Sequence, residues 1–259
     1  MPHAIDVIGC PVTAQGFQEQ VETMAAWAAR RESRMVCAAN VHMLMEAHAR
    51  PDFARILSSS DLVTPDGMPL VWMMRQLGAR QQERVAGMDL LPALCRLAQD
   101  RNLSVYFLGS TPQVLARMRE RLQRDVPRMR IAGMESPPFR PLSPPEEDQL
   151  VDRINESGAN FVMVSLGCPK QERWMHAQRG KIHGVMLGLG GAFPVYAGTT
   201  SMAPQWMRDG GIEWLYRLMQ EPRRLAGRYL TTNLPFAVLA LRQLATQRPL
   251  AALRQPERS

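Results

Sequence analysis

A single aspartate at the end of a short predicted strand is the strongest catalytic candidate in the chain. Asp66 lies in Pro65-Asp66-Gly67, directly after the predicted strand at residues 61–64. A carboxylate on a turn that closes a strand can face a cleft and act as a general base. The tripeptide alone favours a plain turn aspartate, because this composition is common in turns. Asn40 follows the preceding predicted strand and should lie on the same rim, with a helix cap as its alternative role.

The stretch FVMVSLGCPKQERW, residues 161–174, joins a predicted strand to a predicted helix. Its first half is apolar and partly β-branched, which is typical of a buried strand. Gly167 and Pro169 end that strand, and Gln171 lies in the first turn of the helix. A sharp strand-to-helix turn presents backbone N–H groups and the positive end of a helix dipole, which bind phosphate in open α/β sheets. The local pattern alone favours an ordinary connection with a solvated, charged first turn.

Two glycine-containing turns follow other predicted strands. Gly109-Ser110-Thr111-Pro112 can cradle phosphate through its backbone N–H groups, but it lacks both G-x-G-x-x-G and the Walker lysine. The missing G-x-G-x-x-G also argues against a dinucleotide-dependent enzyme. The second turn, at residues 188–191, contains Gly190 and permits close approach of a ligand to the backbone, or simply close packing.

Nothing in the sequence is spaced like a metal site. There is no D-x-D pair, the four cysteines are far apart, and the five histidines do not group with acids or cysteines. If a nucleoside diphosphate were the leaving group of a reaction here, backbone N–H groups and arginine would have to neutralise its charge. We expect neither a metal nor another cofactor.

From Ala203 onward the composition differs from that of the rest of the chain. The net charge is +7 and the isoelectric point about 9.8, with arginines far outnumbering acids after residue 210. Trp206, Trp214 and Tyr216 interleave with these arginines, which suits an interface better than a solvated helix face. A basic end of this kind fits nucleic acid, an anionic membrane surface or a phosphorylated lipid, and its plain alternative is a solubilising tail.

Strands and helices alternate along the rest of the chain. Such alternation implies right-handed crossovers and a Rossmann-like, mainly parallel sheet with helices on both faces. We expect residues 1–200 to form this domain and residues 201–259 a helical appendage. Spaced cysteines predict reduced thiols in the cytosol, and neither a signal peptide nor a spanning segment is expected. The predicted strands are residues 4–8, 35–39, 61–64, 104–108, 130–134, 161–166 and 184–188.

Taken together, these segments resemble the WecG/TagA/CpsF glycosyltransferase family over roughly residues 5–230. No single motif decides the matter, but their order and spacing are very unlike chance. The matching motifs are AANVHML with Asn40, Pro65-Asp66-Gly67-Met68-Pro69, RVAGMDL with Arg84, Leu108-Gly109, Gly167-x-Pro169-Lys170-Gln171-Glu172, Gly188-x-Gly190-Gly191-Ala192-Phe193, Ala197-Gly198, Ala203-Pro204-x-Trp206, Glu213-Trp214-Leu215-Tyr216-Arg217-Leu218 and Glu221-Pro222-x-Arg224.

The resemblance implies a set of roles for these residues. It implies that Asp66 is the general base, that Asn40 and Gln171 position substrate, and that Arg84 lies in the pocket. Gly109 and Gly190 complete the expected strand-end contacts. The resemblance further implies that arginines of the appendage meet the diphosphate, namely Arg217 and Arg224, with Arg228 one position later than in some members. Many members carry threonine near the asparagine, where this chain has Ala38-Ala39.

The leading hypothesis is an inverting, metal-independent transferase in cell-surface polysaccharide synthesis. The family resemblance implies a UDP-sugar donor and an undecaprenyl-diphosphate-linked sugar as acceptor. The donor sugar is expected to be of N-acetylmannosamine type or its uronate, with glucose kept open. We expect the protein to be cytoplasmic and peripheral on the inner face of the membrane, with a homo-oligomer left open. The alternative is a nucleic-acid-binding protein with a Rossmann-like body, although the tail shows no nucleic-acid-binding signature.

Overall fold

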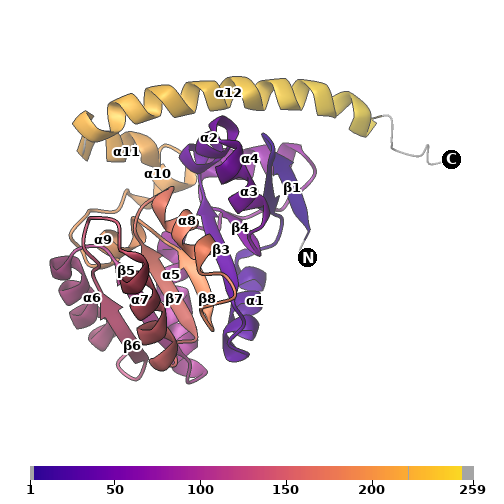
Figure 1. Ribbon diagram of the computed structural model, residues 1–259. Helices are drawn as coiled ribbons and strands as arrows, with labels where there is room; N and C mark the ends of the chain where they lie inside the picture. The colour runs from indigo at the N-terminus through magenta and orange to yellow at the C-terminus, as the bar shows by residue number, and fades with distance from the viewer. Residues whose placement is uncertain (1–2, 221, 253–259) are drawn as a thin grey trace.

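The computed structural model describes residues 3–220 and 222–252 of the chain (Figure 1). Its centre is a six-stranded sheet with the order β4-β3-β8-β7-β5-β6, in which all neighbours run parallel. This confirms the predicted α/β fold. The strands are β3 (Arg34–Ala39), β4 (Leu62–Pro65), β5 (Ser104–Gly109), β6 (Arg130–Glu135), β7 (Phe161–Ser165) and β8 (Val185–Gly188).

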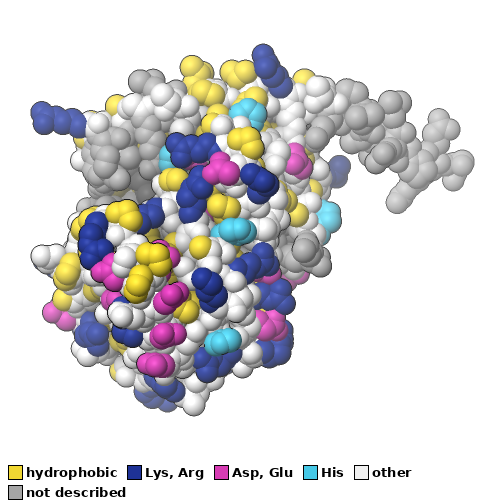
Figure 2. Space-filling view, viewed as in Figure 1, with side chains coloured by type: hydrophobic (Ala, Val, Ile, Leu, Met, Phe, Trp, Pro, Cys, Tyr) yellow, Lys and Arg dark blue, Asp and Glu magenta, His cyan; other side chains and the backbone are white. Residues whose placement is uncertain are grey.

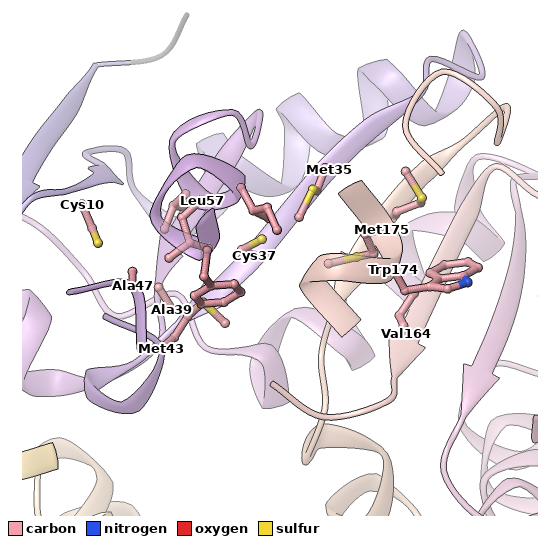
Figure 3. Packing of buried hydrophobic residues seen from close by; sticks show 14 of the residues in the cluster. Cys10, Met35, Cys37, Ala39, Met43, Ala47, Leu57, Val164, Trp174 and Met175 are labelled. Carbon is pink, nitrogen blue, oxygen red and sulfur yellow. The ribbon is translucent and has the colours of Figure 1, made fainter. Parts of the chain in front are cut away.

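Helices cover both faces of this sheet, and each face has its own hydrophobic cluster. Successive residues of a strand point to opposite faces, so Met35 and Cys37 of β3 enter one cluster while Val36 enters the other. Figure 3 shows part of the first cluster, where β3 residues lie near residues of α2 and α8. The first face carries α2 (Val41–Ala49), α3 (Pro51–Ser58), α4 (Met68–Gln76), α7 (Pro144–Glu156) and α8 (Lys170–Ala177). The second carries α1 (Phe17–Ala29), α5 (Gly87–Asp100), α6 (Pro112–Asp125) and α9 (Ala192–Tyr196).

The predicted first strand is present, but it lies outside the parallel sheet. β1 (Ala4–Val7) instead pairs antiparallel with β2 (Cys10–Thr13) in a separate two-stranded sheet. The two residues between them, Ile8 and Gly9, have φ of 48° and 87°, the positive values of a tight hairpin turn. Strands joined by two residues can only pair antiparallel, because a parallel partner needs a long crossover.

The predicted change of texture near residue 203 is confirmed as a helical appendage. It consists of α10 (Gln205–Asp209), α11 (Glu213–Gln220) and the 31-residue α12 (Pro222–Ala252). In Figure 1, α12 crosses over α2 and reaches toward β1. Phe236 and Ala240 are buried there, and Gln243 bonds the backbone of Ile8 and Asp6, each at 2.8 Å. A domain boundary at residue 200 stays a prediction. In the described part of the chain, no helix combines the length and apolarity that crossing a membrane requires.

Candidate active site

The carboxyl edge of the sheet opens where neighbouring strands send the chain to opposite faces. β3 is followed by α2 on the first face, and its neighbour β8 is followed by α9 on the second. Ligands of open α/β sheets bind in crevices of this origin. Because the strands are parallel, Asn40, Asp66, Gln171 and Gly190, which follow β3, β4, β7 and β8, all lie at this edge.

Two cavities meet at this edge. The larger, of about 560 Å³, is walled mainly by apolar side chains of α2, α4 and α12, such as Trp72 and Phe236. The smaller, of about 250 Å³, is lined by glycines of the strand-end loops and by more polar groups, among them Gln171 and Gly190. Four residues line both cavities and so stand at their junction: Asn40, Asp66, Glu213 and Tyr229.

Asp66 lies at the junction because of the register of β4 against β3. Ala39 is opposite Pro65, and the Asp66 N–H donates to the Ala39 carbonyl at 2.8 Å. The Asp66 side chain is half-buried in the junction rather than packed in the core, and it shares the smaller cavity with Gln171. Asn40 also caps α2, its Oδ1 accepting from the Met43 N–H at 3.2 Å. The cap holds Asn40 beside the aspartate.

Gln171 reaches the smaller cavity from the first turn of α8. It is 4% exposed, and its Nε2 donates to Glu172 Oε1 at 2.6 Å. Glu172 is fully buried, and this burial raises the pKa of its carboxyl despite the bond from Gln171. The first turn of α8 is therefore not the solvated charged turn that the local pattern favours. Lys170 is exposed, but the two residues after it are in the interior.

Arg84 lines the larger cavity, where two carboxylates hold its guanidinium. It bonds Asp89 in the first turn of α5 and Glu213 at the start of α11, each at 3.1 Å. Asp89 also faces Arg208 of α10 at 3.5 Å. These pairs join the sheet domain to the appendage at the edge of the site, and they largely neutralise Arg84.

The sequence from residue 5 to residue 250 matches the family described as "Glycosyl transferase WecG/TagA/CpsF family". The chain belongs to this glycosyltransferase family. The N-acetylglucosaminyldiphosphoundecaprenol N-acetyl-beta-D-mannosaminyltransferase of Bacillus spizizenii is 31% identical over 221 residues, which are 85% of this chain and 82% of that relative. The resemblance inferred from the motifs is thereby confirmed, and the family match favours a transferase over the nucleic-acid-binding alternative.

Within this WecG/TagA/CpsF chain, Gly109 does not reach either of the two cavities. It has φ of 106°, and a Cβ built there would lie 2.4 Å from the Ser165 carbonyl oxygen. That oxygen accepts from the Ser110 N–H at 2.9 Å, while Thr111 caps α6 by accepting from the Val114 N–H at 3.3 Å. Gly109 therefore permits close packing of β5 on β7, and its phosphate contact stays a prediction.

The predicted diphosphate contacts from the appendage fall on side chains outside the described residues. Arg217, Arg224 and Arg228 occur in α11 and α12, but their side chains lie outside the described residues. Their role stays a prediction of the family resemblance.

Within the described residues, no three side chains of His, Cys, Asp or Glu gather as metal ligands would.

Two residues at the junction were not assigned a role from the sequence. Glu213 stands in the motif Glu213-Trp214-Leu215-Tyr216-Arg217, which could have pointed to it as the acid of an otherwise basic segment. Tyr229 of α12 carries no such signal, because its place depends on how α12 returns over the sheet domain. Both belong to the appendage, so the site of this family member is built from both parts of the chain.

Proposed function

We propose that this protein transfers a hexose from a UDP-sugar to an undecaprenyl-diphosphate-linked monosaccharide, with inversion, in cell-surface polysaccharide synthesis. The observation that carries the proposal is the meeting of a polar and an apolar cavity at Asp66. The name of the Bacillus relative describes an N-acetylmannosaminyl transfer to a lipid-diphosphate-linked N-acetylglucosamine. We therefore place an N-acetylmannosamine-type sugar first among donors, followed by its uronate and by glucose.

The chemistry of the two cavities suggests how the substrates are divided. The smaller cavity offers strand-end glycines, whose backbone permits close approach, and the Gln171 amide. These groups suit a nucleotide-linked sugar. The apolar walls of the larger cavity suit the first isoprene units behind the acceptor sugar. In this arrangement the acceptor hydroxyl and the anomeric carbon meet at the junction.

The proposed reaction needs one carboxylate. Asp66 takes the proton from the acceptor hydroxyl as that oxygen attacks the anomeric carbon. The bond from the anomeric carbon to the phosphate oxygen breaks on the opposite side, and UDP leaves with the electron pair, which inverts the configuration. Glu213 is the other carboxylate at the junction, and we assign it to holding Arg84, 3.1 Å away, rather than to proton transfer.

The leaving diphosphate needs positive partners. We assign this to strand-end backbone N–H groups and to Arg217, Arg224 and Arg228, rather than to Arg84, which already has two carboxylate partners. No divalent cation is invoked in this scheme. Activity should therefore survive an excess of EDTA, and a strict requirement for added Mg²⁺ or Mn²⁺ would contradict the scheme.

The appendage offers a means of reaching a lipid-linked acceptor. Leu234 and Leu241 of α12 are both 68% exposed, and Trp206 of α10 is 66% exposed. Figure 2 shows hydrophobic side chains at the surface where α12 runs. We propose that these side chains rest in the headgroup region of the inner face of the cytoplasmic membrane, with neighbouring arginines near anionic lipids.

The decisive experiment is a donor screen. The purified full chain is incubated with a panel of UDP-sugars and a short-chain lipid-diphosphate N-acetylglucosamine acceptor, and products are identified by mass spectrometry. One UDP-sugar should yield a disaccharide lipid and UDP, with an inverted anomeric configuration by NMR. Absence of transfer from every donor, with no binding of UDP, would reject the proposal.

A further inference from the structure

The pair Gln171–Glu172 lies at the smaller cavity, and the Glu172 carboxyl has no role in the reaction scheme above. Gln171 lines the cavity and Glu172 lies behind it with no exposed surface. Their side chains are joined by the 2.6 Å bond from Gln171 Nε2 to Glu172 Oε1. Among the described residues, Gln171 Oε1 and Glu172 Oε2 are buried and have no hydrogen-bond partner.

When the Glu172 carboxyl is ionised, it determines which way the Gln171 amide faces. A carboxylate only accepts hydrogen bonds, so it selects the NH₂ end of the amide. The carbonyl oxygen of Gln171 must then face away from Glu172. A Cβ built on Gly190, which lines the cavity, would lie 3.4 Å from Gln171 Oε1. This oxygen is therefore an acceptor directed to the cavity side, without a partner of its own.

The surrounding residues leave room for this pair. A Cβ at Gly188, the last residue of β8, would lie 3.0 Å from Gln171 Nε2 and 3.3 Å from Glu172 Oε1. A side chain at residue 188 would therefore displace the bond. Cys168 and Cys37 lie close enough to interact with the Glu172 carboxyl. Thiols are weak hydrogen-bond donors and compensate a buried carboxylate poorly.

Burying a carboxylate with one oxygen unpartnered is costly for stability. Burial raises the pKa of Glu172, which is the sign of that cost. A neutral residue of the same shape would avoid it. An unsatisfied buried group of this kind calls for a functional explanation, and its side-chain bond to Gln171 connects it to the smaller cavity.

We propose that Glu172 is a positioning residue that locks the Gln171 amide, so that Gln171 Oε1 accepts a hydrogen bond from a hydroxyl or amide N–H of the donor sugar. The inference rests on the proposed function, because it assigns the sugar to the smaller cavity. The bond would hold the sugar in the same cavity as Asp66, ready for attack. UDP without its sugar would not use it.

The test compares Glu172→Gln, Gln171→Ala and the double variant with a control, Glu156→Gln, which removes an exposed carboxylate from α7. In Glu172→Gln the neighbouring amide can donate or accept, so Gln171 is no longer held in one orientation. We expect kcat for sugar transfer to fall about tenfold, the scale of one charge-assisted bond. UDP affinity should stay unchanged and Tm should not fall, since a buried charge is removed. The control should keep wild-type kcat.

The double variant separates positioning from packing. If Glu172 acts through Gln171, the double variant is no slower than Gln171→Ala, because the locked group is already gone. Losses that multiply in the double variant would overturn the proposal. So would wild-type kcat in Glu172→Gln, or a loss of kcat that follows a lower Tm.

A second measurement uses the unmodified chain and needs no activity. The Gln171 side-chain NH₂ resonances, identified by their loss in Gln171→Ala, should exchange slowly with water, unlike those of exposed Gln149. Fast exchange would overturn the locked amide. If no UDP-sugar is turned over but Gln171 exchanges slowly, the proposed function fails while the buried pair stands, so the two failures are distinguishable.

Discussion

At several places along the carboxyl edge of the sheet, neighbouring strands send the chain to opposite faces, and two of these places differ completely in form. Between β3 and β8 the edge opens into the two cavities that meet at Asp66. Between β5 and β7 the same divergence is closed, because the Ser110 N–H bonds the Ser165 carbonyl at 2.9 Å and Gly109 packs against it. A glycine at a strand end is therefore no mark of a ligand site. What decides is whether the backbones at the edge bond one another or leave a gap.

The largest expected effect lies at the open part of the edge, between β3 and β8, where the two cavities meet. Asp66→Asn keeps the shape of the side chain but removes the base, so kcat should fall about a thousandfold, or roughly 4 kcal/mol of transition-state stabilisation. UDP binding by calorimetry should remain, because the base contacts the acceptor hydroxyl. Asp148→Asn, an exposed change on α7, is the matched control. Near wild-type kcat in Asp66→Asn would remove this residue as the base.

A substitution at the closed part of the edge, between β5 and β7, should lower stability and leave catalysis unchanged. In Gly109→Ala the new Cβ would lie 2.4 Å from the Ser165 oxygen at a φ of 106°, so we expect a loss of about 3 kcal/mol in the free energy of unfolding. Urea denaturation measures it, and kcat per folded molecule should be unchanged. Gly180→Ala has a similar φ of 80° but no described atom within 4 Å, and should cost only about 1 kcal/mol. Equal losses in the two variants would show that the contact with Ser165 is unimportant.

This comparison also shows why part of the site was predictable. Asn40, Asp66 and Gln171 follow three strands that are parallel, and parallel strands end at one edge, so their common location follows from order along the chain. Gly109 also lies at the end of a parallel strand, yet the edge is closed there, between β5 and β7. The difference comes from the hydrogen bond between β5 and β7 ends, and no local pattern encodes it.

The remaining features that the sequence did not predict depend on contacts between distant segments. Arg84 meets Glu213 across 129 residues, and this pairing exists only once α11 is folded over the edge of the sheet. Glu172 reads as a solvated charge of a helix start, but Met175 one turn later is fully buried and shows that this side of α8 faces the core. The hairpin β1–β2 was misplaced because the alternation of strands and helices says nothing about an antiparallel pair outside the main sheet.

The appendage covers the open part of the edge, between β3 and β8, and its outer surface should bind membrane. Leu234 and Val238 of α12 are 68% and 45% exposed. Changing both to Asn should weaken binding to phosphatidylglycerol vesicles about thirtyfold, since each apolar side chain contributes on the order of 1 kcal/mol when partly inserted. Co-sedimentation measures the change. Phe139→Asn, in the loop after β6, removes an 88% exposed side chain that does not belong to the appendage and should have no effect. An equal loss in that control would mean that the membrane contact is not specific to the appendage.

The smallest effect is expected at the joint between the two parts of the chain. Glu213→Gln weakens the bond to Arg84, but Asp89 remains as a partner, so the arginine is not left buried and unpaired. The side chains of Arg84 and Glu213 are 13% and 18% exposed, and after this partial screening we expect a loss of about 1 kcal/mol in unfolding free energy. Because Glu213 lines both cavities, kcat should also fall a few-fold as α11 loosens at the junction. Glu22→Gln breaks a pair with Arg101 whose side chains are 45% and 46% exposed, and it should cost less than about 0.5 kcal/mol with kcat unchanged. If both variants lose the same unfolding free energy and both keep full activity, the Arg84–Glu213 pair is an ordinary surface contact. The open part of the edge, between β3 and β8, would then not need the appendage to hold its shape.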